Sequence, residues 1–112
     1  MQGLRSFNPK STNMHYLLTY YYTVDYLERR SAWRHAHIAG AWAAQQRGEM
    51  ILGGAAGDPP DRAFFMFDCN DSTCIEEFVK NDPYVIHGLV ENYDIQPWTT
   101  VVGKDAKNPM RT

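Results

Sequence analysis

Hydrophobic residues along the chain fall into segments with the periods of strands and helices. Residues 14–22 (MHYLLTYYY) are dense in aromatic and aliphatic side chains, which predicts a strand with both faces largely covered. The runs 50–56 (MILGGAA) and 63–67 (AFFMF) predict a second and a third strand. Between them, GDPPD at 57–61 predicts a turn, because proline cannot donate to a strand ladder. We therefore expect the second and third strands to pair in antiparallel fashion.

The longest helix is predicted between the first two strands. Asp25 stands at an N-cap position with Glu28 three residues later, which is the spacing of a capping box. No proline follows as far as Gln46, alanine is frequent, and Gly48 supplies a stop signal. We therefore expect one continuous helix from Asp25 to Gln46.

A second helix is predicted after the third strand. Asp71 or Ser72 can cap it, and an apolar stripe follows at helical spacing. It ends before Pro83, because the residue that precedes a proline is pushed out of the α region. Residues 84–89 are compatible with a further helical turn.

The last predicted strand covers residues 92–102 (NYDIQPWTTVV), where Pro97 favours an edge position or a bulge. The element order is then β-α-β-β-α-β. This order predicts an α+β fold, the ferredoxin-like split βαβ, with two helices on one face of a four-stranded antiparallel sheet. The strands are apolar on both faces, and an uncovered apolar face normally marks an interface. We therefore expect a homodimer formed through the sheet faces, with higher assemblies of dimers as a further option.

Composition narrows the function classes. The chain has 112 residues, of which 44% are hydrophobic and 21% charged, the profile of one soluble domain. Its formal net charge of -2 offers no basic field for nucleic acid or anionic lipid, and no apolar run could cross a membrane. We expect a domain over 14–103 between a flexible extension at 1–13 and a flexible tail at 104–112. Organelle targeting by residues 1–13 is the weaker alternative for that extension.

Cysteine and histidine spacing argues against a metal site. Cys69 and Cys74 are too few for a disulfide scaffold and fit no common zinc-binding pattern. We therefore expect a reducing, cytoplasmic setting. His35 and His37 point to nearly opposite sides of the predicted helix, so they cannot share a metal ion. No metal and no cofactor is predicted.

An arginine and a histidine interrupt the apolar side of the first predicted helix. Leu27, Ile38 and Ala41 mark the side that should face the sheet, and Arg34 and His37 lie on or next to it. Burying either one without a partner would be costly, so both must meet partners or line a cavity. Two hypotheses stay open: a structural salt bridge of Arg34 with an edge contact of His37, or a ligand site.

Several motifs along the chain resemble those of a known family. They are DYLERR at 25–30 with RHAH at 34–37, GGA at 53–55 with GDPP at 57–60 and AFF at 63–65, DPYV at 82–85 with GLV at 88–90, and PW at 97–98. From about Met14 to about Gly103, the chain is similar to the YciI-like (YCII-related) family of the dimeric α/β-barrel superfamily. The resemblance implies a ferredoxin-like protomer whose sheet pairs with that of a second protomer.

The resemblance also implies a site built from His37 and Asp82. A histidine beside a carboxylate can keep one tautomer and move protons near neutral pH. Arg34, one helical turn from His37, would hold an anion such as a carboxylate or phenolate. Tyr84 would donate a hydrogen bond to a developing oxyanion.

These residues predict proton-transfer chemistry. The sequence contains no nucleophile motif or cofactor fingerprint, which leaves isomerisation, elimination or lyase chemistry on a small polar or aromatic anion. The alternative is a non-catalytic dimer that binds a small ligand or serves as an accessory domain, with Asp82 capping backbone amides. The two hypotheses differ in geometry, because a catalytic pair must face an open cavity within hydrogen-bond reach.

Overall fold

Strand β1 (Met14–Tyr22) occupies the middle of a four-stranded antiparallel sheet in the computed structural model, which describes residues 13–111. It pairs with β3 (Pro60–Cys69) on one side and with β4 (Val90–Trp98) on the other. Strand β2 (Met50–Gly57) extends the sheet beyond β3 and is antiparallel to it, as predicted. The strand order β2-β3-β1-β4 confirms the ferredoxin-like α+β fold.

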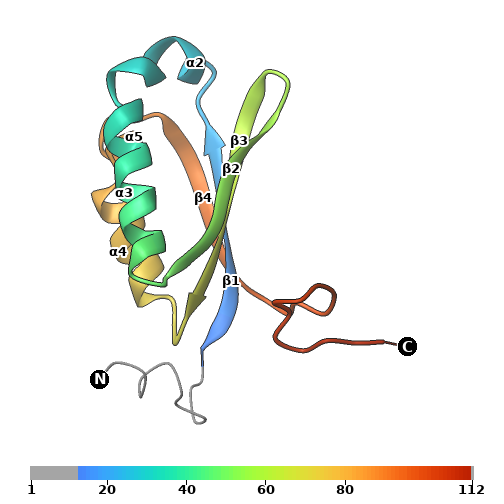
Figure 1. Cartoon of the computed structure of the whole chain (residues 1–112). Coiled ribbons are helices and arrows are strands. Elements are labelled where there is room, and N and C mark those ends of the chain that lie inside the picture. Colours follow the sequence, from blue (N-terminus) through green and yellow to red (C-terminus); the bar gives the residue numbers. More distant parts are fainter. Residues whose placement is uncertain (1–12, 112) are drawn as a thin grey trace.

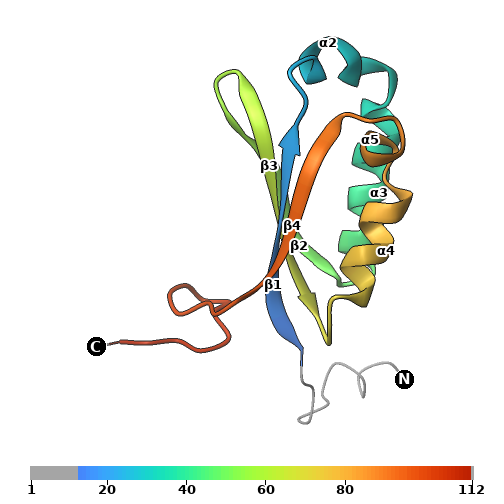
Figure 2. The same ribbon diagram turned by 180° about the vertical axis from the view of Figure 1, so that it is seen from behind.

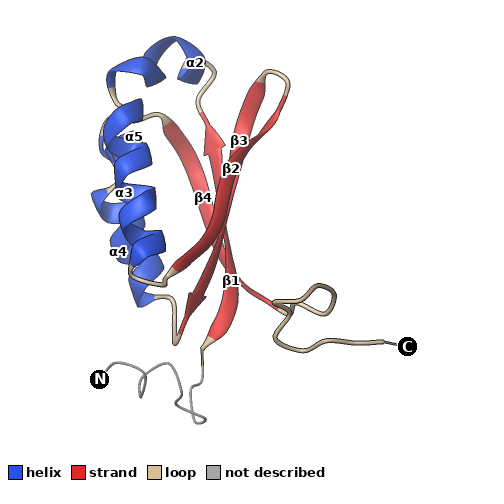
Figure 3. Ribbon diagram, viewed as in Figure 1, coloured by secondary structure: helices blue, strands red, loops and turns tan. Residues whose placement is uncertain are grey.

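All helices of the described chain lie on one face of the sheet (Figures 1, 2 and 3). Helices α3 (Arg34–Gln46) and α4 (Thr73–Asn81) run along this face, and α5 (Pro83–Ile86) is the helical turn expected after Pro83. Two short elements, α2 (Tyr26–Arg29) and the 3₁₀ helix η1 (Arg30–Ala32), lead into α3. Among the described residues, no helix is long and apolar enough to cross a membrane.

The prediction of one continuous helix from Asp25 to Gln46 is wrong, because this segment forms three separate elements, α2, η1 and α3. The Asp25 carboxylate does not cap a helix and instead accepts a hydrogen bond from the Thr23 hydroxyl at 2.7 Å. Arg29 donates to the backbone carbonyl of His87 at 2.6 Å, and Trp33 stacks on the His87 ring with centroids 3.5 Å apart. These contacts tie the first turns to the segment after α5, so tertiary contacts override local helix propensity.

The predicted strands occur with shifted ends. Strands β2 and β3 continue into the predicted turn, where Gly57 pairs with Pro60. Gly57 adopts a φ of +103°, and a Cβ there would lie 2.9 Å from the carbonyl oxygen of Pro59, so this position requires glycine. Strand β4 ends at Trp98, earlier than predicted, and lies at a sheet edge as Pro97 suggests.

Cys69 and Cys74 are joined by a disulfide, whereas the expected reducing setting predicts two free thiols. Cys69 ends β3 and Cys74 lies in the first turn of α4, so the tight connection brings their Cα atoms within 6.9 Å. The bond ties the end of the sheet to the start of α4. The cytoplasmic location stays a prediction.

The structure describes most of the predicted C-terminal tail but only residue 13 of the predicted N-terminal extension. Residues 1–12, most of the predicted extension, lie outside the described part of the chain. Residues 104–111 of the predicted tail are described and make hydrogen bonds with residues 100–103. The boundaries at 14 and 103 stay predictions.

The core lies between the sheet and the helices. Alternate residues of β1 point into it, and its largest fully buried side chains are Leu18, Tyr20, Phe67, Ile75, Tyr84 and Leu89. Burying one such apolar side chain stabilises the fold by about 1.5–3 kcal/mol. The opposite sheet face has no helix over it and carries an apolar band, defined here as Leu17, Leu52, Phe64 and Met66. Leu52 is 72% exposed and Phe64 39% exposed.

Two adjacent glycines of β2 should respond differently to an added methyl group. A Cβ at Gly53 would lie 2.8 Å from Cδ2 of the buried Phe65 ring, whereas a Cβ at Gly54 would meet nothing within 4 Å. We expect Gly53→Ala to lower the free energy of unfolding by about 1–3 kcal/mol, because the packed ring must move. Gly54→Ala should change it by less than about 0.5 kcal/mol. Urea unfolding measures both, and equal losses would contradict this packing of Phe65.

Candidate active site

The Asp82 carboxylate is buried between α4 and α5 and is surrounded by donors. The backbone of Asp82 is extended (φ -77°, ψ 122°), as expected for a residue before proline, and only 3% of the residue is exposed. The Tyr20 hydroxyl donates to Oδ2 at 2.7 Å, and the Tyr84 backbone N–H donates to Oδ1 at 3.0 Å. A buried carboxylate needs such partners, and these two fix its orientation.

His37 completes the set of donors to Asp82. Its Nδ1 lies 2.8 Å from Oδ1 and 3.0 Å from Oδ2 of the carboxylate, and its ring stacks on Tyr84 with centroids 3.9 Å apart. Because a carboxylate can only accept, the proton of a neutral His37 belongs on Nδ1, which leaves the lone pair on Nε2. Within residues 13–111, Nε2 has no hydrogen-bond partner.

His37 borders a cavity of about 480 Å³. The cavity exists because small residues face each other across it: Ala41 on α3, and Gly53, Gly54 and Ala55 on β2. Larger apolar residues line its remaining walls, namely Ile38, Trp42, Met50, Ile51 and Phe65. A cavity of this size and lining is large enough to hold a small, partly apolar molecule next to the histidine.

Two arginines give the cavity a cationic end. Arg30 and Arg34 both line it, and neither forms an ion pair with a carboxylate within the described residues. The Arg30 guanidinium lies 5.5 Å from the centroid of the Tyr26 ring, and hydrogen bonding to Tyr26 raises the pKa of Arg30 above its usual value. Both side chains can therefore receive an anionic group of a ligand.

Tyr84 lines the same cavity as a protonated phenol. Burial, supported by the neighbouring Tyr26, raises the pKa of Tyr84 to about 12, although Arg34 and Arg30 act in the opposite direction. Tyr84 therefore keeps its hydroxyl proton at neutral pH and can donate it to a ligand oxygen. Burial and the adjacent Asp82 likewise raise the pKa of Tyr20, which accordingly stays a donor to the carboxylate.

A second cavity, of about 520 Å³, reaches the pair from between α3 and α4. His37 and Asp82 both border it, and Gly40, Glu77 and Asn81 are among its other lining residues. His37 thus separates two spaces, one on the sheet side of α3 and one between the helices. Residues 13–111 contain no group of three or more His, Cys, Asp and Glu side chains that could hold a metal ion.

The four residues proposed from the sequence lie in one region. His37 and Asp82 are in direct contact, and Arg34, His37 and Tyr84 border the same cavity. Arg34 is exposed at the cavity wall and makes no salt bridge with a described carboxylate, so the structural ion pair held open above is not found there. His35 points to solvent, as predicted.

Sequence reasoning misplaced some residues of this region and missed others. Leu27 and Ile38 were expected to pack on the sheet, yet each is 41% exposed. The break before α3 removes Leu27 from its helical face, and Ile38 borders open space. Tyr20 was missed because its strand position predicts only a core residue. Arg30 lies in the motif at 25–30, but no sequence signal links it to Tyr26.

Comparisons with known proteins place the chain in a family. The model of the YCII-related domain matches residues 14–99, so the chain belongs to the YCII-related family. No curated protein matches it significantly. A 5-chloro-2-hydroxyhydroquinone dehydrochlorinase from Burkholderia phenoliruptrix AC1100, solved in complex with 2,5-dihydroxybenzoquinone, is similar over 84% of this chain and 100% of its own, with 20% identity and a TM-score of 0.67.

A second solved structure has the same fold at lower similarity. It is a protein from Bacteroides thetaiotaomicron VPI-5482 proposed to be an antibiotic biosynthesis monooxygenase. The likeness covers 89% of this chain and 97% of that one, with 13% identity and a TM-score of 0.54. At these identities both structures show a shared fold and no more.

Proposed function

We propose that this YCII-related protein is a small enzyme that moves a proton with His37, on a small aromatic or polar anion bound in the cavity beside it. The observation that carries the proposal is the contact of His37 Nδ1 with Asp82 at 2.8 Å, with the opposite nitrogen left without a partner among the described residues. A histidine held in this way is oriented as a general base. The cavity supplies the place for the substrate.

The proposed step is a proton transfer that the described side chains can carry out. His37 Nε2 accepts a proton from an acidic O–H or C–H of the substrate, and the imidazolium that forms is stabilised by the Asp82 carboxylate. The electron pair left on the substrate either moves within it, which gives isomerisation, or expels a leaving group, which gives elimination. The proton then returns to the substrate or passes to solvent, for which the second cavity offers a route.

The cavity walls suggest the substrate class. Arg30 and Arg34 would bind an anionic group, and the Tyr84 hydroxyl would donate to an oxygen that gains charge. The apolar walls favour a flat ring over an extended polar chain. The dehydrochlorinase neighbour was solved with a hydroxylated quinone, which makes such compounds sensible first probes for this protein.

We infer also that the protein is a homodimer through the sheet face opposite the helices. The apolar band of Leu17, Leu52, Phe64 and Met66 supports this, since a monomer would leave it in water. A two-fold pairing would cover the band on both copies at once.

A panel of hydroxylated benzoquinones, hydroquinones and small aromatic carboxylates tests the enzymatic proposal. Thermal shift identifies ligands, and NMR in D₂O then follows exchange of ligand C–H protons for deuterium, which requires no knowledge of the final product. We expect the wild type to catalyse exchange or elimination, and His37→Gln to slow it by about 10²–10⁴-fold, the usual contribution of a general base.

His35→Gln is the matched control, because His35 lies on the same helix and points to solvent. It should leave the rate within about twofold, as a surface substitution away from the site does. Equal rates for wild type and His37→Gln would contradict the proposal. Ligand binding without exchange or turnover in the wild type would instead establish the non-catalytic binding hypothesis.

Arg34→Leu tests whether the cationic end binds an anion. Arg34 is exposed, so we expect the variant to fold with near wild-type stability and to bind anionic ligands on the order of tenfold more weakly. Arg62→Leu, which removes an exposed arginine on the β2–β3 hairpin, should leave binding unchanged. The stabilisation that ligand gives in thermal unfolding measures the affinity. A large loss of stability without ligand would show that Arg34 has a structural role instead.

A further inference from the structure

The segment after β4 stands away from the rest of the molecule. Residues 99–111, here called the C-terminal arm, project from the side of the sheet opposite the helices in both views (Figures 1 and 2). The arm is held in shape by its own backbone, because Asn108 donates to the carbonyl of Thr100 at 3.0 Å and Met110 donates to that of Val101 at 2.9 Å. It is therefore a folded-back loop with a defined direction.

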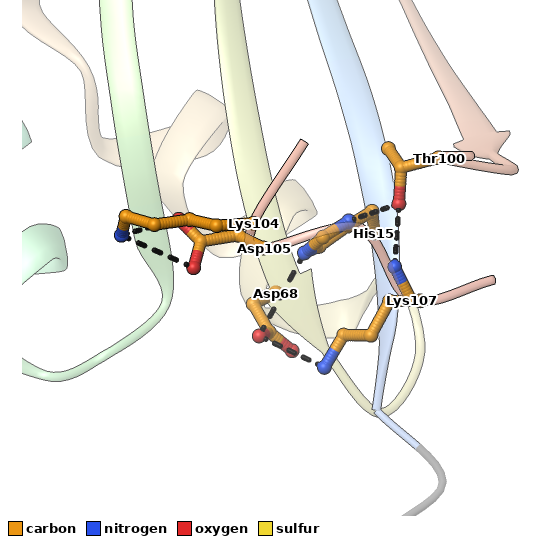
Figure 4. Close-up of polar contacts among 6 residues, drawn as sticks. All are labelled: His15, Asp68, Thr100, Lys104, Asp105 and Lys107. Atoms are coloured by element: carbon orange, nitrogen blue, oxygen red, sulfur yellow. Dashed lines mark hydrogen bonds and ion pairs between the residues drawn. The ribbon is translucent and has the colours of Figure 1, made fainter. Parts of the chain in front are cut away.

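A buried polar network fixes the base of the arm on the sheet (Figure 4). His15 of β1 is 2% exposed, and its Nδ1 lies 2.7 Å from the Thr100 hydroxyl, which also accepts the Lys107 backbone N–H at 3.0 Å. The Lys107 ammonium lies 3.1 Å from Oδ2 of Asp68 on β3. Side chains of β1 and β3 thus hold the base of the arm in place, on the sheet face that carries the apolar band.

The outer part of the arm exposes apolar side chains that its own chain does not cover. Val102 is 84% exposed and Met110 is 62% exposed, and Trp98 at the end of β4 is 42% exposed. None of the hydrogen bonds that shape the arm involves these apolar side chains. Exposed apolar residues on a projecting, anchored loop are typical of a binding surface.

We propose that the C-terminal arm packs against a second copy of this chain and forms part of the dimer interface. This inference rests on the sheet-to-sheet dimer proposed above, because the arm and the apolar band lie on the same side and one two-fold pairing would cover both. Lys104 and Lys107 of the arm pair with Asp105 and Asp68 of the same chain, whereas Arg111 pairs with no carboxylate of the described residues. Arg111 can therefore meet an acidic group on a second copy, whose formal net charge is -2.

The small size of the arm argues against a separate partner. A stable interface takes about 800 Å² and 20–30 residues from each side, more than a loop of this length supplies alone. Added to the edge of the sheet-face contact, the same loop extends an interface that already exists. We therefore assign the arm to the dimer.

Sedimentation velocity over a dilution series of the full chain tests this assignment. The double variant Val102→Asp, Met110→Asp should raise the dimer dissociation constant at least about tenfold, because it places charges against the partner's surface. Ile86→Asp is the matched control, since Ile86 is 61% exposed on α5, on the helix side. It should leave the constant within about twofold. Circular dichroism and urea unfolding confirm that each variant is folded.

Phe64→Asp separates failure of the arm from failure of the dimer. It alters the apolar band directly and should also weaken the dimer. If Phe64→Asp weakens the dimer while the arm variant behaves as wild type, the arm assignment is overturned and the sheet-face dimer stands. A wild type that is monomeric at every concentration overturns both. Equal weakening by Ile86→Asp and the arm variant also overturns the assignment, because the effect would not depend on the arm.

Discussion

The arrangement of the candidate site depends on the hydrogen bonds that the buried Asp82 carboxylate accepts. It accepts hydrogen bonds from the Tyr20 hydroxyl on the central strand, from the backbone N–H of Tyr84 in α5, and from His37 on α3. Three elements far apart in the sequence therefore meet at one buried anion. Loss of one donor would allow the carboxylate to rotate away from the remaining two. It would also lower the stability of the fold, because a buried charge that lacks a hydrogen-bond partner costs free energy. The same contact that orders the core sets the direction of the histidine.

The cavity beside His37 results from a second constraint, the shortage of large side chains between α3 and β2. Helices normally pack on a sheet through Leu, Ile or Phe, but here Ala41 faces Gly53 and Ala55 across open space. Filling this space would stabilise the protein, so its persistence suggests a use. The exposure of Ile38 and Trp42, which looks like poor packing of α3, is what gives the cavity apolar walls.

The sequence was sufficient for the fold because strand periodicity, turn residues and element order all agree on it. It was also sufficient for the His37–Asp82 pair, although through family resemblance and not through spacing, since 45 residues separate the two. Helix propensity predicted a continuous helix through Arg30, but the contacts of Arg29 and Trp33 with His87 interrupt the helix there. Tyr20 could not be identified, because a tyrosine in a central strand looks the same whether or not its hydroxyl meets a carboxylate. The disulfide was missed because it depends on the tight connection between β3 and α4.

The tautomer of His37 tests the account most directly. Long-range ¹H–¹⁵N NMR of protein labelled at histidine distinguishes a protonated Nδ1 from a protonated Nε2 in the neutral ring. The account predicts that neutral His37 carries its proton on Nδ1 in the wild type. It also predicts that Asp82→Asn shifts the proton to Nε2, because one amide oxygen cannot replace a carboxylate that accepts from three donors. A wild-type His37 protonated on Nε2, or a tautomer unchanged in Asp82→Asn, would contradict it.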